Sequence, residues 1–100
     1  MATVRRTPQA EADLEVILDD LEEKSPKAAE RFAGAVDEKC STLGNFPEMG
    51  RARDEIAPGL RSTVVGRYVL FYQLRGDVVE VLRILHGRRD IRRIMRDEPQ

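Results

Sequence analysis

The sequence contains one histidine, His86, followed directly by Gly87-Arg88-Arg89-Asp90. Histidine often acts as a general acid or base because it titrates near neutral pH. Asp90 could orient the imidazole and the arginines could hold a phosphate, so the segment is compatible with phosphodiester transfer in RNA. The alternative is a histidine that caps a strand end or packs under a terminal helix. A lone histidine without a second base or a metal ligand favours this structural role.

Other residue types give no catalytic or metal-binding pattern. Cys40 is the only cysteine and is far from His86 in sequence, so the two do not make a ligand set. There is no glycine-rich phosphate loop, nucleophile elbow or paired-cysteine motif. We therefore expect no metal and no cofactor. Cys40 falls on an apolar helical stripe, which predicts a small buried hydrophobic residue rather than a reactive thiol.

Arginine is concentrated in the second half of the chain. Residues 1–50 carry six Lys or Arg against eleven Asp or Glu, whereas residues 51–100 carry eleven Arg against seven acids, so a net charge of −5 is followed by one of +4. Guanidinium groups pair bidentately with carboxylates or phosphates, which predicts an anionic partner, with surface ion pairs as the alternative. Helical spacing would place the last arginines on two ridges: Arg88, Arg92 and Arg96 on one, Arg89 and Arg93 on the other.

Two helices are predicted to position these residues. Thr7-Pro8 and Ser25-Pro26 are typical helix starts, Lys24 closes the first helix, and Gly44 is a plausible stop for the second. Each helix carries an apolar stripe, which consists of Leu14, Ile17, Leu18 and Leu21 in the first and Ala29, Phe32, Ala33, Val36, Cys40 and Leu43 in the second. The short link between them predicts an antiparallel hairpin.

Strands are predicted around this hairpin. Residues 3–7 indicate a first strand, and 45–60, with two prolines and two glycines, a connecting loop. Apolar runs at 60–65, 68–74 and 78–85 are separated by Gly66-Arg67 and Gly76-Asp77, which suit type II′ turns and predict a three-stranded meander. A last helix is predicted within residues 87–97, with 98–100 frayed.

These elements predict one α+β domain over residues 1–97, of order β-α-α-β-β-β with a short C-terminal helix. The helical hairpin should cover one face of a small, mainly antiparallel sheet. The other face should be open to a partner and carry Tyr68, Tyr72, Arg61 and Arg83. No run approaches eighteen apolar residues, and the first residues include no apolar signal segment, so we expect a cytoplasmic protein without a membrane partner.

The segment FPEMGRARDEIAPGLRSTVVGRYVLFYQLRGDVVEVLRILHGRRDI, residues 46–91, resembles the ParE branch of the RelE/ParE superfamily of type II toxins. The resemblance is carried by four pieces: Phe46-Pro47 with Gly50-Arg51, Pro58-Gly59-Leu60-Arg61, Tyr68-Val69-Leu70-Phe71-Tyr72, and Arg83 to Asp90. The preceding strand and hairpin also match, so it covers nearly the whole chain. It implies a growth-arresting toxin of the kind that serves plasmid maintenance, directed against DNA gyrase and neutralised by a ParD-like antitoxin.

The RelE branch of the same superfamily implies a different activity, ribosome-dependent cleavage of mRNA. Its members carry basic side chains on the central strands and an aromatic residue or histidine in the last segment, where this chain has Ser62, Val69, and Ile94 or Met95. A non-enzymatic gyrase inhibitor is therefore favoured. Under the ribonuclease alternative the catalytic residues would be His86, Arg61 and Arg89. A detoxified paralogue that only binds its antitoxin is a third alternative.

Two binding surfaces follow from this interpretation. The target would be bound by Arg88, Arg89, Arg92 and Arg93, or alternatively by the tip of the helical hairpin. The antitoxin would lie along the hairpin and a sheet edge, in contact with Arg61, Arg83, Arg89, Leu14 and Leu18. We expect no direct sequence-specific DNA binding by this chain alone.

Overall fold

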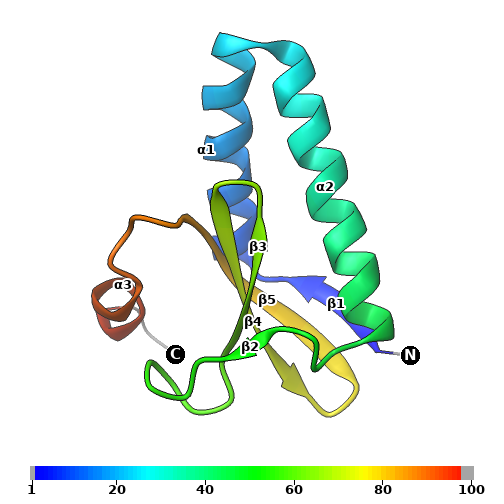
Figure 1. Ribbon diagram of the computed structural model, residues 1–100, viewed down its shortest axis with the longest axis vertical. Coiled ribbons are helices and arrows are strands. Elements are labelled where there is room, and N and C mark those ends of the chain that lie inside the picture. The colour runs from blue at the N-terminus through cyan, green and yellow to red at the C-terminus, as the bar shows by residue number, and fades with distance from the viewer. Residues whose placement is uncertain (1, 98–100) are drawn as a thin grey trace.

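A computed structural model of the protein describes residues 2–97, with side chains described up to residue 94. The elements are β1 (Thr3–Arg6), α1 (Pro8–Lys24), α2 (Pro26–Asn45), β2 (Arg51–Ala52), β3 (Arg61–Val65), β4 (Tyr68–Arg75), β5 (Val78–His86) and α3 (Ile91–Asp97). The strands form one sheet in the order β1-β5-β4-β3-β2, in which only the β1–β5 pair is parallel (Figure 1). The predicted α+β architecture is confirmed, and β2 is an addition within the predicted loop. The predicted frayed segment, residues 98–100, lies outside the described residues.

The helical hairpin forms where the two helix-start signals predict it. Thr7 Oγ1 accepts a hydrogen bond from Ala10 N at 3.1 Å and donates to Leu82 O at 3.1 Å, so the cap of α1 also attaches the helix to β5. Ser25 ends α1 by donating its N–H to Leu21 O and begins α2 by accepting from Ala28 N. One residue between two proline-started helices makes them antiparallel, and they extend well beyond the sheet (Figure 1).

The meander follows the predicted turns but contains an unpredicted bulge. Gly66 and Gly76 have φ of 60° and 59°, and no non-glycine residue in the described chain has a positive φ, which fits type II′ turns. The β4–β5 register shifts between Phe71, which pairs with Arg83, and Tyr72, which pairs with Val81. Leu82 is therefore an extra residue on β5.

Apolar side chains are packed on both faces of the sheet. The helix-side cluster includes Leu14, Ile17, Val36, Leu43, Leu70, Tyr72 and Val79, with Tyr68 packed against it. The outer cluster contains Leu60, Phe71 and Leu85, covered by residues of the 51–60 loop and of α3. The prediction of an open face carrying Tyr68, Tyr72, Arg61 and Arg83 is therefore wrong. Both tyrosines lie on the helix side, Arg61 is the register partner of Tyr72, and Arg83 binds Asp13 of α1.

The C-terminal helix begins four residues later than the predicted segment. Arg89 N donates to His86 O at 2.9 Å in a tight turn, and Asp90 Oδ1 then accepts from Arg93 N at 3.3 Å as α3 starts. Arg88 and Arg89 therefore precede the helix, and the two predicted arginine ridges do not form. The side chain of Arg96 lies outside the described part of the chain.

Candidate functional site

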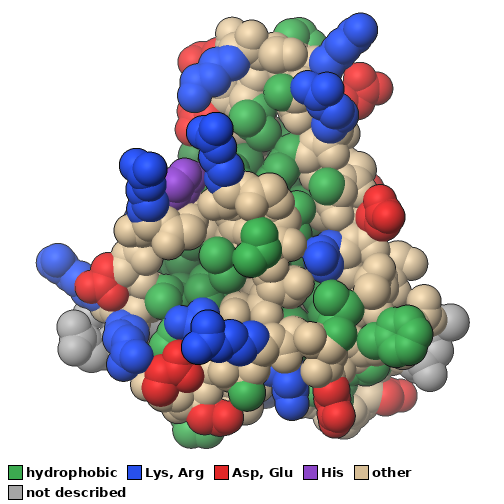
Figure 2. Space-filling view, viewed as in Figure 1, with side chains coloured by type: hydrophobic (Ala, Val, Ile, Leu, Met, Phe, Trp, Pro, Cys, Tyr) green, Lys and Arg blue, Asp and Glu red, His purple; other side chains and the backbone are tan. Residues whose placement is uncertain are grey.

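Five exposed arginines lie on the β3–β4 turn and on the segment after β5, which leads from that end of the sheet into α3. This group, the arginine end, consists of Arg67, Arg88, Arg89, Arg92 and Arg93. The two segments are joined by a hydrogen bond of 3.0 Å from Gly87 N to Arg67 O. In Figure 2, Lys and Arg side chains flank the single histidine on this side of the molecule. The predicted target-binding arginines are thus exposed and joined by a fifth, Arg67, which the sequence analysis missed because a turn residue gains its neighbours only through strand pairing.

His86 contacts the arginine end through the backbone of Arg88. Its Nδ1 accepts a hydrogen bond from Arg88 N at 3.2 Å, and its ring packs edge-on against Tyr68, with 5.4 Å between ring centroids. Tyr68 in turn packs edge-on against Phe32 of α2, at 5.1 Å. Asp90 caps α3, with a carboxylate oxygen held by Arg93 N. The histidine therefore caps the strand end, and this carboxylate oxygen serves the helix start instead.

Arg61, which the ribonuclease alternative groups with His86 and Arg89, lies at the opposite end of β3. It pairs with Tyr72 while His86 pairs with Tyr68, four residues away along β4. Four strand residues span about 13 Å. The Arg61 guanidinium donates to Glu48 O at 3.1 Å and Gly50 O at 2.8 Å. Of the three predicted catalytic residues, Arg89 lies beside His86, whereas Arg61 does not converge with them on one phosphate-sized site.

The outer face of the central strands is apolar and packed. Val69 and Ile94 belong to the outer cluster with Phe71, and Ser62 beside them is buried, its Oγ accepting from Arg53 Nη1 at 3.3 Å. Arg53 is also held by Glu55 at 2.8 Å and lies 5.9 Å above the Phe71 ring. Around Ser62, Val69 and Phe71 this face is therefore filled by packed side chains, and the guanidinium of Arg53 there is already paired.

Most of the predicted antitoxin contacts are engaged inside the protein. Arg83 donates to both carboxylate oxygens of Asp13 at 2.7 and 2.9 Å, and Ile84 N donates to the same carboxylate at 3.0 Å. Leu14 is buried in the helix-side cluster. Leu18 lines a shallow hollow of about 280 Å³ between the helices, together with Glu22, Pro26, Ala29, Glu30 and Ala33. Of the five predicted contacts, Leu18 and Arg89 are the ones that a partner can reach most directly.

A second apolar hollow lies beyond the end of α2. It measures about 490 Å³ and includes the exposed side chains of Phe46, Met49 and Leu74. Tyr72 fixes the loop that forms it, since its hydroxyl donates to Pro47 O and accepts from Gly50 N, both at 2.9 Å. Residues 45–60 carry no periodic pattern, so the sequence predicts only a connecting loop here.

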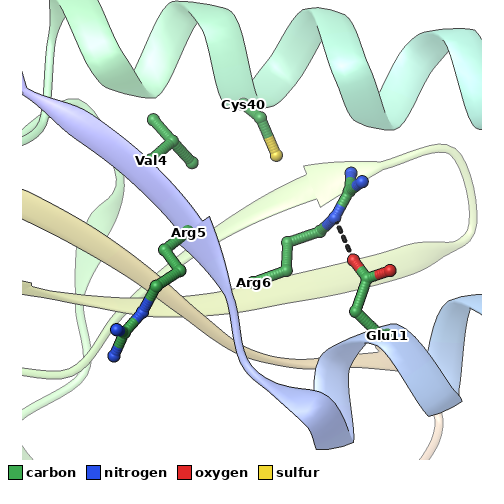
Figure 3. A pocket seen from close by; sticks show the side chains of 5 residues that line it. All are labelled: Val4, Arg5, Arg6, Glu11 and Cys40. Atoms are coloured by element: carbon green, nitrogen blue, oxygen red, sulfur yellow. Dashed lines mark hydrogen bonds and ion pairs between the residues drawn. The ribbon is translucent and has the colours of Figure 1, made fainter.

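Cys40 lies beside a polar cluster where β1 meets the helices. Figure 3 shows Val4, Cys40 and Arg6 around a hollow of about 410 Å³, with Arg6 hydrogen-bonded to Glu11. Arg6 also pairs with Asp37 at 3.3 Å. Burial raises the pKa of the Cys40 thiol, and the nearby Arg6 offsets only part of this. Cys40 therefore remains a thiol at neutral pH. It packs against the helix-side cluster as predicted, but it is only partly buried.

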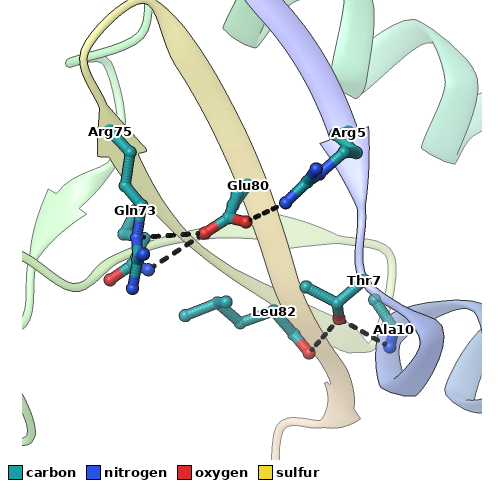
Figure 4. Close-up of polar contacts among 7 residues, drawn as sticks. All are labelled: Arg5, Thr7, Ala10, Gln73, Arg75, Glu80 and Leu82. Atoms are coloured by element: carbon teal, nitrogen blue, oxygen red, sulfur yellow. Dashed lines mark hydrogen bonds and ion pairs between the residues drawn. The ribbon is translucent and has the colours of Figure 1, made fainter. Parts of the chain in front are cut away.

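Glu80 joins three strands on the outer face. It accepts hydrogen bonds from Arg5 of β1 at 2.5 Å and Gln73 of β4 at 3.2 Å, and it pairs with Arg75 at 3.2 Å (Figure 4). The hydrogen bond from Gln73, followed by that from Arg5, lowers the pKa of Glu80.

Among the described residues there is no group of three or more potential metal ligands. No described helix combines the length and apolar character needed to cross a membrane.

Comparison with known proteins connects this fold to toxins. Residues 4–91 match the family described as "ParE toxin of type II toxin-antitoxin system, parDE". The chain is 34% identical over 92 residues to Toxin ParE3 of Caulobacter vibrioides, covering 91% of this chain and 92% of that protein. It is 35% identical over 89 residues to Toxin ParE1 of Mycobacterium tuberculosis, covering 87% and 91%.

Two further similarities concern the choice between the ParE and RelE branches and the fold. Toxin RelE2 of Caulobacter vibrioides is 36% identical over 89 residues, which cover 89% of this chain and 99% of that protein. A solved structure described as "Chromosomal ParDE TA system from P. aeruginosa" superposes with a TM-score of 0.74 at 24% identity, covering 86% of this chain and 96% of that one. At this identity the superposition supports the shared fold.

Proposed function

This chain belongs to the ParE toxin family of type II toxin-antitoxin systems, and from that membership we propose that it arrests growth by binding DNA gyrase and is neutralised by a ParD-type antitoxin. The observation that carries the choice of target is the packed apolar outer face of the central strands. A ribonuclease needs a base, an acid and a cation around one phosphate. Here the part of that face beside α3 is filled by apolar side chains.

The ribonuclease alternative has one specific observation in its favour, the similarity to a relative named RelE2. Against it, His86 accepts a backbone N–H, Asp90 caps a helix, and Arg61 holds a loop about 13 Å from His86 along the sheet. A chain lacking the assembled acid, base and cation should lose several orders of magnitude in rate. We therefore place the toxin's action in binding.

We propose that the target is engaged by the arginine end. Its guanidinium groups are exposed, and arginine there can bind carboxylates or phosphates with two parallel hydrogen bonds. The variant Arg88→Glu/Arg89→Glu/Arg92→Glu should remain folded, because these side chains lie outside both apolar clusters, and it should lose toxicity. A folded triple variant that still inhibits gyrase would contradict this assignment.

We propose that the antitoxin lies along the helical hairpin, with apolar residues over the hollow beside Leu18 and acidic residues reaching Arg89. The hollow combines an apolar floor with open access between α1 and α2. Arg61, Arg83 and Leu14, the other predicted contacts, would contribute by holding the loop, the β5 bulge and the helix in place. Leu18→Asp should weaken antitoxin binding in a pull-down more than Val16→Asp, which changes an exposed residue of the same helix.

The experiment that tests the function follows DNA and protein synthesis in bacteria during the first minutes after this chain is expressed without an antitoxin. An early fall in DNA synthesis, with inhibition of gyrase by the purified chain, is the expected result. An early fall in protein synthesis would support the ribonuclease. Continued synthesis of both while folded protein accumulates would instead indicate a detoxified paralogue.

A further inference from the structure

We infer that the arginine end binds the phosphate backbone of double-stranded DNA directly and without sequence preference, so that the chain contacts the nucleic acid as well as its protein target. The inference concerns a ligand that the proposed gyrase interaction does not itself require. Only the choice of DNA among duplex nucleic acids rests on the proposed function, since gyrase acts on duplex DNA. The evidence is which arginines are ion-paired in the folded protein and which are exposed without an ion pair among the described residues.

The fold pairs five of its other arginines with carboxylates, whereas no ion pair is found at the arginine end among the described side chains. Ion pairs engage Arg5, Arg6, Arg53, Arg75 and Arg83. Among the described side chains, none of the five residues of the arginine end has an ion-paired carboxylate, and Glu55 acts on Arg92 only at longer range. Asp90, the acid within the segment, has a carboxylate oxygen engaged by a backbone N–H. The excess positive charge is therefore available to an external anion.

The aromatic residues at this end favour a duplex over a single strand. Binding to single strands relies on exposed rings on which bases stack. Here Tyr68 packs edge-on against both Phe32 and His86, and Phe32 and Tyr68 also pack against the helix-side cluster. Contacts are thus limited to phosphates, which position a protein on DNA but do not read its sequence.

The arrangement of the β3–β4 turn and the turn at residues 86–89 suits contact with the phosphate backbone of DNA. The 3.0 Å hydrogen bond between Gly87 N and Arg67 O brings side chains from two turns together, and the tight turn at 86–89 presents Arg88 and Arg89 ahead of α3. Each guanidinium that neutralises a phosphate releases a counterion, so salt dependence reports the number of contacts. Five contacts would give a slope of about −4.5 in log affinity against log salt concentration.

The test measures fluorescence anisotropy of a labelled 20-base-pair DNA duplex with the purified full chain between 50 and 200 mM salt. Arg88→Gln/Arg89→Gln/Arg92→Gln should reduce the magnitude of the slope by about 2.7 and weaken binding at least tenfold at the lowest salt. The matched control is Lys24→Gln/Lys27→Gln/Arg31→Gln, which removes three exposed positive charges from the hairpin. It should leave the slope unchanged. Circular dichroism checks that both variants are folded.

Three results would overturn the inference: no duplex binding at 50 mM salt, equal losses in the two variants, or tighter binding to a single strand of the same length. A parallel supercoiling assay separates it from the proposed function. Duplex binding without gyrase inhibition would support the inference and refute the gyrase proposal. Gyrase inhibition without duplex binding would refute the inference and leave the protein target in place.

Discussion

Tyr72 is fully buried, yet its hydroxyl serves the surface loop that precedes β2. Burial raises the pKa of Tyr72, so the hydroxyl stays protonated, donating to Pro47 O while accepting from Gly50 N. Gly50 is needed at this close approach, because an added Cβ would lie 2.5 Å from the Tyr72 hydroxyl. Tyr72→Phe leaves two loop groups without partners and should cost about 1–3 kcal/mol of unfolding free energy.

Thermal unfolding measures this cost, at about 4–8 °C of Tm per kcal/mol for a domain of this size. Tyr68→Phe is the matched control, since its hydroxyl makes no hydrogen bond among those found in the described residues. If both variants lost the same stability, the loop clamp would not be the reason for the Tyr72 hydroxyl.

Glu80 makes the stability depend on pH. Its pKa is lower in the folded chain than in the unfolded one, so its ionised form favours folding above the unfolded value of about 4.3. This stabilisation is lost as pH falls through the lowered folded value. Glu80→Gln should therefore reduce the difference in unfolding free energy between pH 7 and pH 3, measured by urea titration. Glu15→Gln, at an exposed position of α1, should keep the wild-type difference.

Among the elements, α1 and β5 are joined by a largely buried ion pair. The side chains of Arg83 and Asp13 are only 13% and 14% exposed, and Ile84 N also uses the Asp13 carboxylate. Asp13→Ala should cost about 3–5 kcal/mol, because the Arg83 charge and the Ile84 N–H lose that carboxylate. Asp13→Leu/Arg83→Met should recover much of this loss.

A double-mutant cycle by urea unfolding checks this, with the single variants Asp13→Leu and Arg83→Met as its other corners. Additive costs would show that the pair contributes no coupling. A large coupling would explain why the predicted antitoxin contact at Arg83 is engaged within the fold.

Element types were predictable where local chemistry decides them. Thr7-Pro8, Ser25-Pro26, Gly66 and Gly76 each act through a cap or a turn, and the structure confirms them. The extra residue Leu82 and strand β2 were not predictable, because each depends on pairing between distant segments. The start of α3 is instead set by a local signal, the Asp90 cap, which the sequence analysis assigned to His86. The same limit applied to the site: exposed arginines could be named, but which of them are paired depends on residues up to 75 positions away.

At the scale of the whole molecule, charge is separated between the hairpin and the arginine end. Helix α1 carries seven acids and one lysine, and it forms one arm of the hairpin that projects beyond the sheet (Figure 1). The protein measures 37 Å along its longest axis. Such a charge distribution should direct the arginine end toward a polyanion and hold the hairpin away from it.

Neutralising exposed hairpin acids therefore tests this orientation. Glu22→Gln/Glu23→Gln/Glu30→Gln should raise the affinity for duplex DNA a few-fold at 10 mM salt, where the Debye length of about 30 Å approaches the size of the molecule. The gain should vanish at 150 mM, where the Debye length is about 8 Å, because acids far from the DNA are then screened. Anisotropy titrations at the two salt concentrations measure it. A gain that persisted at 150 mM would place the hairpin against the DNA, and binding through the arginine end alone would then be excluded.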